Sequence, residues 1–204
     1  MTPSLRNLPQ EERRDKAASI IEEILDEDEC VKVRFGKEVL IKELLPDKQT
    51  EVSTSLTIEH GNYKKMFGLA GDGENLMEAL FSGFSLLFFG QWKFLDYIDV
   101  LEVDVNTVPI DVYETKDKRK YVEAVLIVGC HDRKQLAFRE TASSINAATL
   151  SVFLECVEHF INAEKAVKVL MDAIADSKKR SRGDLEVSFL LKLSKILESS
   201  YCDD

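Results

Sequence analysis

Residues 67–89 read FGLAGDGENLMEALFSGFSLLFF, and the rest of the chain is organised around this stretch. Phe67 and Leu69 alternate with small residues, which is typical of a half-buried strand. Gly71 and Gly73 follow, and glycines at this position predict a turn that takes positive φ without strain. Apolar residues then recur at helical spacing, namely Leu76, Ala79, Leu80, Phe84, Leu87 and Phe88. The stretch therefore predicts a strand, a glycine turn and an amphipathic helix that begins near Glu74 and Asn75.

The glycine turn has two interpretations. A turn that leads into a helix N-terminus gathers free N–H groups, which can hold a carboxylate or a phosphate. The alternative is a tight turn ahead of a core helix, because short glycine motifs often occur without a ligand. Taken alone, the stretch favours the tight turn.

A second copy of the pattern follows at a shift of 69 residues, which places Leu69 on Phe138. The same shift places Leu56 and Ile58 on Val125 and Ile127. The apolar positions of the first helix fall on Ile145, Ala148, Thr149, Phe153, Cys156 and Val157. This self-similarity favours two duplicated strand–strand–helix units over a longer repeat array. We expect a pair related by a pseudo-twofold axis.

Composition restricts the class of protein. The 204 residues are 45% hydrophobic and 31% charged, which is ordinary for one globular domain with helical additions. The net charge of −10 disfavours binding to nucleic acid or to an anionic membrane. No apolar run is long enough to span a membrane, and the first residues lack an apolar signal region, so we expect a cytoplasmic location.

The sequence offers little catalytic chemistry. The cysteines Cys30, Cys130, Cys156 and Cys202 lie far apart and form no C-x-x-C pair. His60, His131 and His159 are not spaced as metal ligands on a helix. No nucleophile elbow and no phosphate-binding loop occurs. We therefore expect no enzyme activity, no metal and no cofactor.

The remaining elements follow from periodicity and turn residues. Helices are predicted at 8–26, 142–161, 162–177 (continuous with its predecessor or separate) and 185–199. Strands are predicted at 31–35, 39–44, 52–60, 65–70, 94–105 (starting near Tyr97), 110–113, 121–130 and 135–139. Hairpin turns are predicted at Gly36–Lys37 and at Gly61–Asn62. The predicted fold is α+β, with two βββα units whose antiparallel sheets pack on helices, and with extra N- and C-terminal helices.

Three motifs, in order, resemble the C-terminal regulatory domain of 2-isopropylmalate synthases and citramalate synthases. The family's glycine loop, G-x-G-P-V-D-A-L, corresponds to residues 73–80, GENLMEAL. Its L-x-D-Y strand corresponds to residues 94–97, FLDY. Its second helix opening, D-I-x-x-A-S-x-x-A-Y-L-x-A, corresponds to residues 144–156, SINAATLSVFLEC. The resemblance covers about residues 52–162, although Asn75 and Leu76 replace a glycine and a proline, and the synthases' catalytic barrel has no counterpart here.

The resemblance implies a regulatory domain that dimerises and binds an end-product amino acid of leucine biosynthesis, either leucine or isoleucine. It divides the chain into an N-terminal helix and hairpin at 1–50, the duplicated domain at 51–162 and a helical extension at 163–204. The ligand carboxylate would bind N–H groups around Gly71 to Asn75, and the aliphatic chain would contact Met77, Tyr97, Ile145 and Ala148. The full set of implied ligand-binding residues is Gly71, Gly73, Asn75, Met77, Ala79, Asp96, Tyr97, Ser144, Ile145 and Ala148.

Two functions from different classes follow. One is a non-catalytic amino-acid sensor that forms a homodimer. The other is an interaction module with a degenerate ligand site, whose terminal helices recruit a partner such as a synthase catalytic subunit. The altered glycine loop and the additional helices favour the second, whereas the motif order favours the first.

Overall fold

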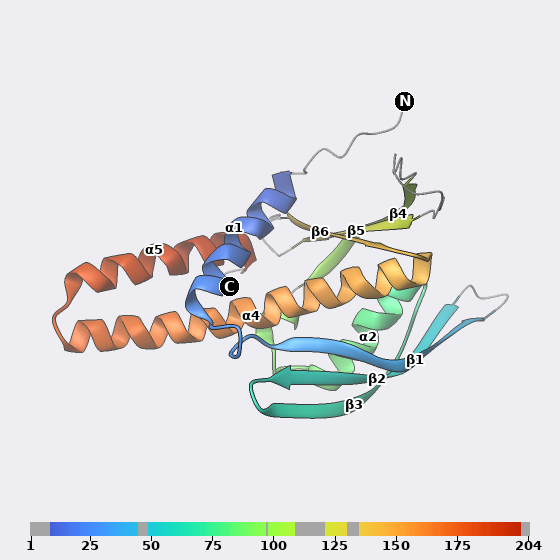
Figure 1. The fold of residues 1–204 in the computed structure, drawn as a ribbon, viewed down its shortest axis with the longest axis horizontal. Helices are drawn as coiled ribbons and strands as arrows, with labels where there is room; N and C mark the ends of the chain where they lie inside the picture. The colour runs from blue at the N-terminus through green and yellow to red at the C-terminus, as the bar shows by residue number, and fades with distance from the viewer. Residues whose placement is uncertain (1–8, 45–48, 97, 109–120, 130–134, 201–204) are drawn as a thin grey trace, which may run out of the picture.

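The computed structural model describes residues 9–44, 49–96, 98–108, 121–129 and 135–200. It confirms the predicted α+β class, because two three-stranded antiparallel sheets pack against helices (Figure 1). The first sheet has the order β1-β2-β3 and the second the order β4-β5-β6. Each sheet is followed in sequence by a helix that packs on it, so the chain contains two βββα units.

The first unit comprises β1 (Lys32–Leu44), β2 (Gln49–His60), β3 (Tyr63–Gly73) and α2 (Leu76–Phe88). The second unit comprises β4 (Asp99–Val108), β5 (Tyr121–Gly129), β6 (Gln135–Ala142) and α4 (Ile145–Lys179). The one-turn helix α3 (Lys93–Asp96) connects the two units. Two further helices, α1 (Pro9–Ile24) and α5 (Gly183–Ser200), precede and follow them.

Helix α4 holds the two units together. Its first half lies between the sheets, where it contacts β5 and β6 on one side and β1 and α2 on the other (Figure 1). Phe153 of α4 is completely buried and packs against Phe35 of β1 and Phe81 and Phe84 of α2. The two units therefore share one hydrophobic core.

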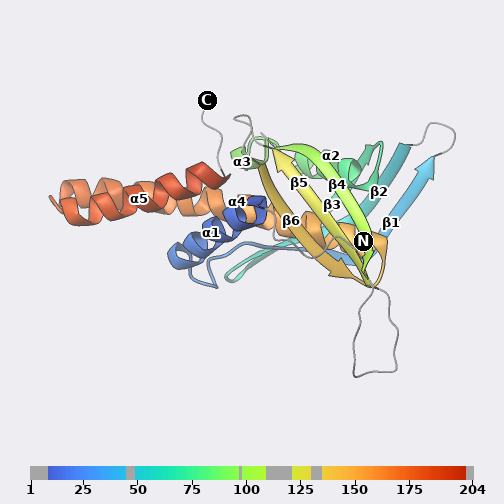
Figure 2. The ribbon, with the colours of Figure 1, turned by 90° about the horizontal axis from the view of Figure 1, so that it is seen from above.

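The second half of α4 leaves this core. It pairs with α5 in a helical hairpin that projects from the body of the molecule (Figures 1 and 2). Helix α1 crosses the base of the hairpin and contacts α4, α5 and β6. One continuous helix spans residues 145–179. The sequence had left open whether the predicted helices at 142–161 and 162–177 are joined or separate.

The glycines at the end of β3 have a different role from the predicted one. Gly71 and Gly73 belong to the strand, and among the described residues the glycines with positive φ are Gly61 and Gly90. A Cβ on Gly71 would lie 2.1 Å from the carbonyl oxygen of Ala79 and 2.4 Å from the backbone nitrogen of Gly83. The prediction of a positive-φ turn was therefore wrong, because these glycines let α2 lie directly on the strand backbone.

The predicted hairpin at Gly36–Lys37 was also wrong. Residues 32–44 form one strand that pairs with β2 throughout, and its register shifts between Phe35 and Val39. A Cβ on Gly36 would lie 1.9 Å from Oγ of Ser55 on the neighbouring strand. The glycine thus permits a bulge in a continuous strand, and a bulge gives the same local sequence signal as a tight turn. The hairpin at Gly61–Asn62 is confirmed.

The duplication is real, but its register differs from the predicted one. Leu69 pairs with Thr54 in the first sheet, and Phe138 pairs with Leu126 in the second. The third strands therefore correspond at a shift of 69 residues and the middle strands at a shift of 72. The predicted match of Leu56 with Val125 was wrong, because an odd slip moves a side chain to the other face of a sheet. The hairpin of β5 and β6 is shorter than that of β2 and β3. A match of the two copies at one fixed shift cannot show this difference.

Smaller differences concern element ends. Residues 93–96 form a helical turn, so β4 begins at Asp99 and not within 94–97. Ala142 ends β6, and α4 begins at Ile145. The predicted strand at 110–113 lies outside the described residues. None of the described helices is both long enough and apolar enough to cross a membrane.

The contact between β3 and α2 gives the first prediction. Gly71→Ala should lower the free energy of unfolding by about 2 kcal/mol or more, because the added methyl group overlaps the backbone of α2. Gly68→Ala in the same strand is the control, since a Cβ at that position would have no heavy atom within 4 Å outside its chain neighbours. That change should stay within about 0.5 kcal/mol. Urea denaturation measures both, and equal effects would contradict the proposed role of Gly71.

Candidate functional site

A hollow of about 390 Å³ lies where the first turns of α2 and α4 meet the first sheet. We call it the inter-helix hollow. Its lining residues are Ile41, Glu43, Gln49, Thr50, Glu74, Asn75, Leu76, Ile145, Asn146 and Thr149. They come from β1, β2 and the starts of the two helices. The duplicated helices thus converge on one cavity with their N-terminal ends.

The two helix N-termini are capped differently. Asn75 caps α2 by accepting a hydrogen bond from the Glu78 N–H at 3.0 Å. The Glu78 carboxylate in turn accepts hydrogen bonds from the Glu74 N–H and the Asn75 amide, each at 3.0 Å. This reciprocal arrangement is a variant of the capping box, in which the Glu78 carboxylate binds the N–H of the residue before the cap. The start of α2 therefore already holds a carboxylate of its own.

The start of α4 has only half of that arrangement. Ser144 accepts a hydrogen bond from the Ala147 N–H at 3.2 Å. Ala147 occupies the position that Glu78 has in α2, and α4 carries no acidic residue in its first turn. Because the N-terminus of a long helix favours a negative charge, this end can attract a carboxylate from outside the helix.

The rest of the lining is mixed. The carboxylates of Glu43 and Glu74 give the cavity negative charge on the side of the first unit. The apolar lining comes from Ile41, Leu76 and Ile145, and Ile145 is 58% exposed.

Eight of the ten predicted site residues divide into three groups. Asn75 and Ile145 line the inter-helix hollow, and Ser144 caps the helix beside them. Gly71 and Gly73 lie on β3 beneath α2. The buried core contains the others from the first turns of the helices, namely Met77, Ala79 and Ala148.

Asp96 belongs to none of these groups, because it lies away from the inter-helix hollow. Its carboxylate accepts a hydrogen bond from the Gly90 N–H at 3.2 Å, just after the C-terminal end of α2. The 13 residues of α2 separate it from the hollow by about 20 Å, at 1.5 Å per residue. Tyr97 lies outside the described residues.

Sequence reasoning did not find Glu43, Ile41, Thr50 or Thr149. The strand residues Ile41, Glu43 and Thr50 reach the hollow only because β1 pairs with β2. The sequence around each of these residues does not indicate that pairing. Thr149 lies one helical turn after Ile145 and was identified only as part of the repeat. A search one turn beyond the predicted N-cap would have included it.

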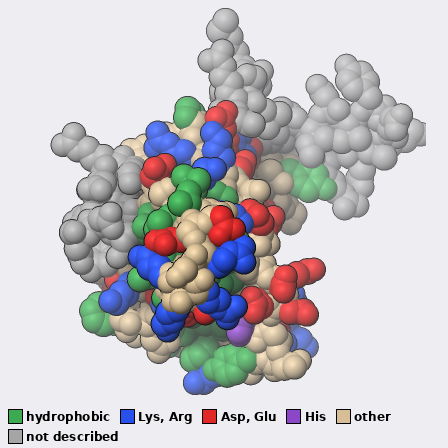
Figure 3. Space-filling view, turned by 90° about the vertical axis from the view of Figure 1, so that its left-hand side faces the viewer, with side chains coloured by type: hydrophobic (Ala, Val, Ile, Leu, Met, Phe, Trp, Pro, Cys, Tyr) green, Lys and Arg blue, Asp and Glu red, His purple; other side chains and the backbone are tan. Residues whose placement is uncertain are grey.

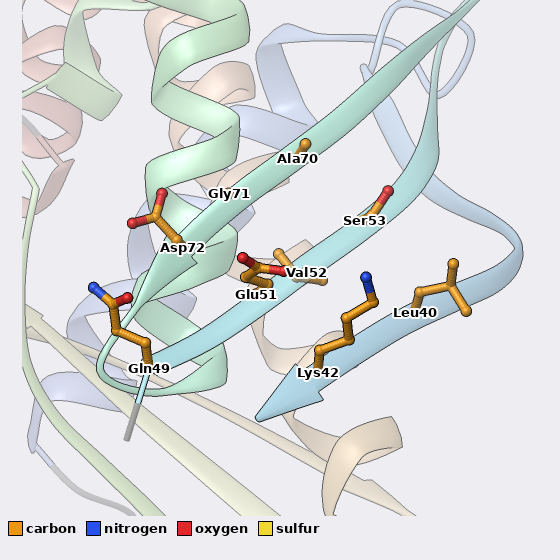
Figure 4. Close-up of a pocket in the computed structure, with 9 residues that line it drawn as sticks. All are labelled: Leu40, Lys42, Gln49, Glu51, Val52, Ser53, Ala70, Gly71 and Asp72. Carbon is orange, nitrogen blue, oxygen red and sulfur yellow. The ribbon is translucent and has the colours of Figure 1, made fainter. Parts of the chain in front are cut away.

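A second hollow, of about 420 Å³, lies on the outer face of the first sheet (Figure 4). Leu40, Ser53 and Ala70 form one cross-strand row and Lys42, Glu51 and Asp72 the next. The backbone N–H and C=O groups of the central strand are used in pairing with both neighbours, so this face offers side chains only. It contains no helix terminus, and we consider it the weaker candidate.

A third hollow, of about 290 Å³, lies under α1. Its polar side chains connect elements of the fold. Glu158 accepts a hydrogen bond from the Val33 N–H at 2.6 Å, and Asn162 binds both the N–H and the C=O of Val31. Arg14 of α1 forms an ion pair with Glu155 of α4. These contacts attach α1 and the start of β1 to α4.

Burial changes the protonation of this region. It raises the pKa of Glu155 to about 7, although Arg14 acts in the opposite direction. Burial also lowers the pKa of His159 to about 3, with Arg14 adding to the effect. His159 is therefore neutral at pH 7, where it packs edge-on against Phe138 and Phe160. The region behaves as a polar part of the core.

Within the described ranges, no group of three His, Cys, Asp or Glu residues is placed to hold a metal ion. Comparison of the sequence with known protein families and with curated proteins finds no match. The relation to the synthase regulatory domains consequently depends on the three sequence motifs alone.

The Glu155 environment predicts a pH dependence. The folded state binds the Glu155 proton more tightly than the unfolded state, so this carboxyl stabilises the fold below about pH 4.5 and the stabilisation is lost as the pH rises to about 7. Glu155→Gln does not titrate, so its stability relative to the wild type should rise between pH 5 and pH 8. We expect a change of about 1–2 kcal/mol, less than the full shift implies because the side chain remains partly exposed.

Urea denaturation at several pH values measures this difference. Carbon-13 NMR of the Glu155 carboxyl would follow its titration directly. A stability difference that stays constant from pH 5 to pH 8 would contradict the assignment.

Proposed function

We propose that this chain is a non-catalytic sensor that binds a small aliphatic amino acid, leucine or isoleucine, in the inter-helix hollow. The supporting observation is that one cavity combines an incompletely capped helix N-terminus, two carboxylates and three aliphatic side chains. Its volume of about 390 Å³ falls within the range of small-molecule sites, about 300–1,000 Å³.

In this proposal the ligand carboxylate binds at the first turn of α4. The counterpart in α2 is occupied by Glu78, which shows that this type of helix start accommodates a carboxylate with good geometry. Ala147 supplies no such group to α4. The bound ligand would therefore complete at α4 the arrangement that α2 makes internally.

The ligand ammonium group binds toward Glu43 and Glu74, and the side chain toward Ile41, Leu76 and Ile145. The lining thus offers both a helix N-terminus for a carboxylate and carboxylates for an ammonium group, which suits a zwitterion better than a simple acid or amine. The proposed site differs from the one that the glycine loop suggested. It lies a short distance from β3, at the two helix starts.

The resemblance to the synthase domains supports the same class of function. It extends the proposal to a cytoplasmic homodimer that acts in the regulation of leucine biosynthesis. It also names a candidate partner, a synthase catalytic subunit that the domain would control.

The alternative is an interaction module without a ligand. The observation that favours it is the projecting hairpin, where Val187, Leu190 and Leu191 of α5 are 43–58% exposed. Binding of a partner such as a synthase catalytic subunit would cover these side chains. The two functions are distinguished by whether amino acids bind the isolated chain.

Thermal shift and calorimetry test the proposal. Leucine or isoleucine should raise the melting temperature, because a ligand that binds only the folded state stabilises it by about 2.7 kcal/mol at 100 times its Kd. Leucinamide, which lacks the carboxylate, and 4-methylpentanoate, which lacks the ammonium group, should bind at least tenfold more weakly. Absence of any shift at millimolar amino acid would refute the sensor.

Two variants make the test specific. Ala147→Glu should build a second capping box, keeping or raising stability by a few tenths to about 1 kcal/mol while weakening ligand binding at least tenfold. If Ala147→Glu keeps or raises stability while it weakens ligand binding, misfolding is excluded as the cause of the weaker binding. Glu74→Gln should also weaken binding, and Glu12→Gln on the exposed side of α1 is the charge-matched control.

A further inference from the structure

Helix α5 is apolar on two opposite sides. Phe189, Leu193 and the completely buried Ile196 face the rest of the protein. On the other side, Val187 is 58% exposed, Leu190 43% and Leu191 58%. These last three residues recur at i, i+3 and i+4 and so form one stripe, which we call the outer stripe. A helix that is apolar on both sides is expected to be covered on both sides.

Figure 3 views the molecule from the side on which the hairpin projects, and hydrophobic side chains lie there among charged ones. The outer stripe is flanked at one end by Asp184, which is ion-paired with Arg182 at 2.9 Å, and at the other end by Lys195. Asp184 lies near the start of α5 and Lys195 near its end, about three helical turns apart and therefore on the same flank. Leu190 lies midway between them.

We infer that the outer stripe binds the outer stripe of a second copy of this chain, with the two α5 helices antiparallel. This inference rests on the homodimer in the proposed function and names its contact surface. A twofold axis near Leu190 places Asp184 of each copy beside Lys195 of the other. A parallel arrangement would place the two Asp184 side chains at the same level on opposite flanks of the pair, so it would form neither of these Asp–Lys contacts.

The rest of the hairpin has matching charges. Its tip carries Lys178, Lys179, Arg180 and Arg182, of which three are ion-paired with Glu186, Asp176 and Asp184 of the same hairpin, in a chain whose net charge is −10. Lys192 of α5 contacts Glu23 at 2.8 Å, which locates the acidic end of α1 at the base of the hairpin. In the antiparallel pair with its axis near Leu190, the basic tip of each copy reaches the level of the last turn of α5 in the other copy. Two strongly acidic molecules thus meet through their least acidic part.

The size of the surface sets the strength of the contact. Helix α5 has 18 residues and is about 27 Å long. One helix pair of this length buries less than the roughly 1,200–2,000 Å² of stable complexes. The dimer should therefore be reversible and depend on protein concentration.

Sedimentation equilibrium of the full chain from about 1 to about 100 µM tests the inference. Leu191→Glu should raise the dimer dissociation constant at least tenfold. Leu86→Glu is the matched control, because Leu86 is 75% exposed on α2, away from the hairpin, and the change introduces the same charge. The control should leave the dissociation constant within about twofold of the wild type.

A charge reversal tests the orientation. Asp184→Lys and Lys195→Asp should each weaken the dimer, and the double variant should recover most of the loss because opposite charges face each other again. Circular dichroism checks that α5 stays helical in each variant. Failure of the double variant to recover would exclude the antiparallel arrangement.

The outcomes separate this surface from the proposed function. A wild-type dimer that Leu191→Glu leaves intact would overturn the outer stripe as the interface while leaving the homodimer standing. A monomer at every concentration, or a hairpin that binds only other proteins, would overturn both the interface and the homodimer. Amino-acid binding is measured independently and is unaffected by either result.

Discussion

The architecture depends on a backbone-to-backbone contact between α2 and β3. At Gly71 the strand approaches the helix so closely that a Cβ would overlap the carbonyl oxygen of Ala79. A Cβ on Gly83 would in turn lie 2.8 Å from the carbonyl oxygen of Ala70, so glycine is required on both sides of the contact. This depth of packing fixes where α2 begins relative to the sheet. It therefore fixes one wall of the hollow that α2 shares with α4.

The two units follow the same plan, yet they are not equivalent where their helices begin. In α2 the Glu78 carboxylate completes the capping box, whereas α4 has Ala147 in that position. Duplication places two helix starts at one cavity, and this single difference leaves one of them available to an external carboxylate. The proposed chemistry arises from the asymmetry between the copies and not from a catalytic motif.

Helix α4 connects the inter-helix hollow, the contact with α1 and the hairpin with α5. Its first turn borders the inter-helix hollow. Its middle holds α1 through Glu155, and the start of β1 through Glu158 and Asn162. Its last turns form the hairpin with α5. Because the helix is continuous over 35 residues, it spans about 50 Å without an interruption. A ligand would therefore contact the start of this rigid element, and a second subunit would contact α5, which packs on its last turns.

The sequence by itself determined the fold class, the duplication, the helix start at Asn75 and the hairpin at Gly61–Asn62, because periodicity and turn chemistry are local. The resemblance to the synthase domains named Ser144 and Ile145, which lie at the start of α4 beside the hollow. Sequence reasoning misassigned Gly36 and Gly71, since a glycine that relieves a clash with a distant chain segment has the same local pattern as a glycine in a turn. Only the tertiary structure brought Glu43 of β1 to the helix starts, because strand pairing and helix packing act between residues far apart in the sequence.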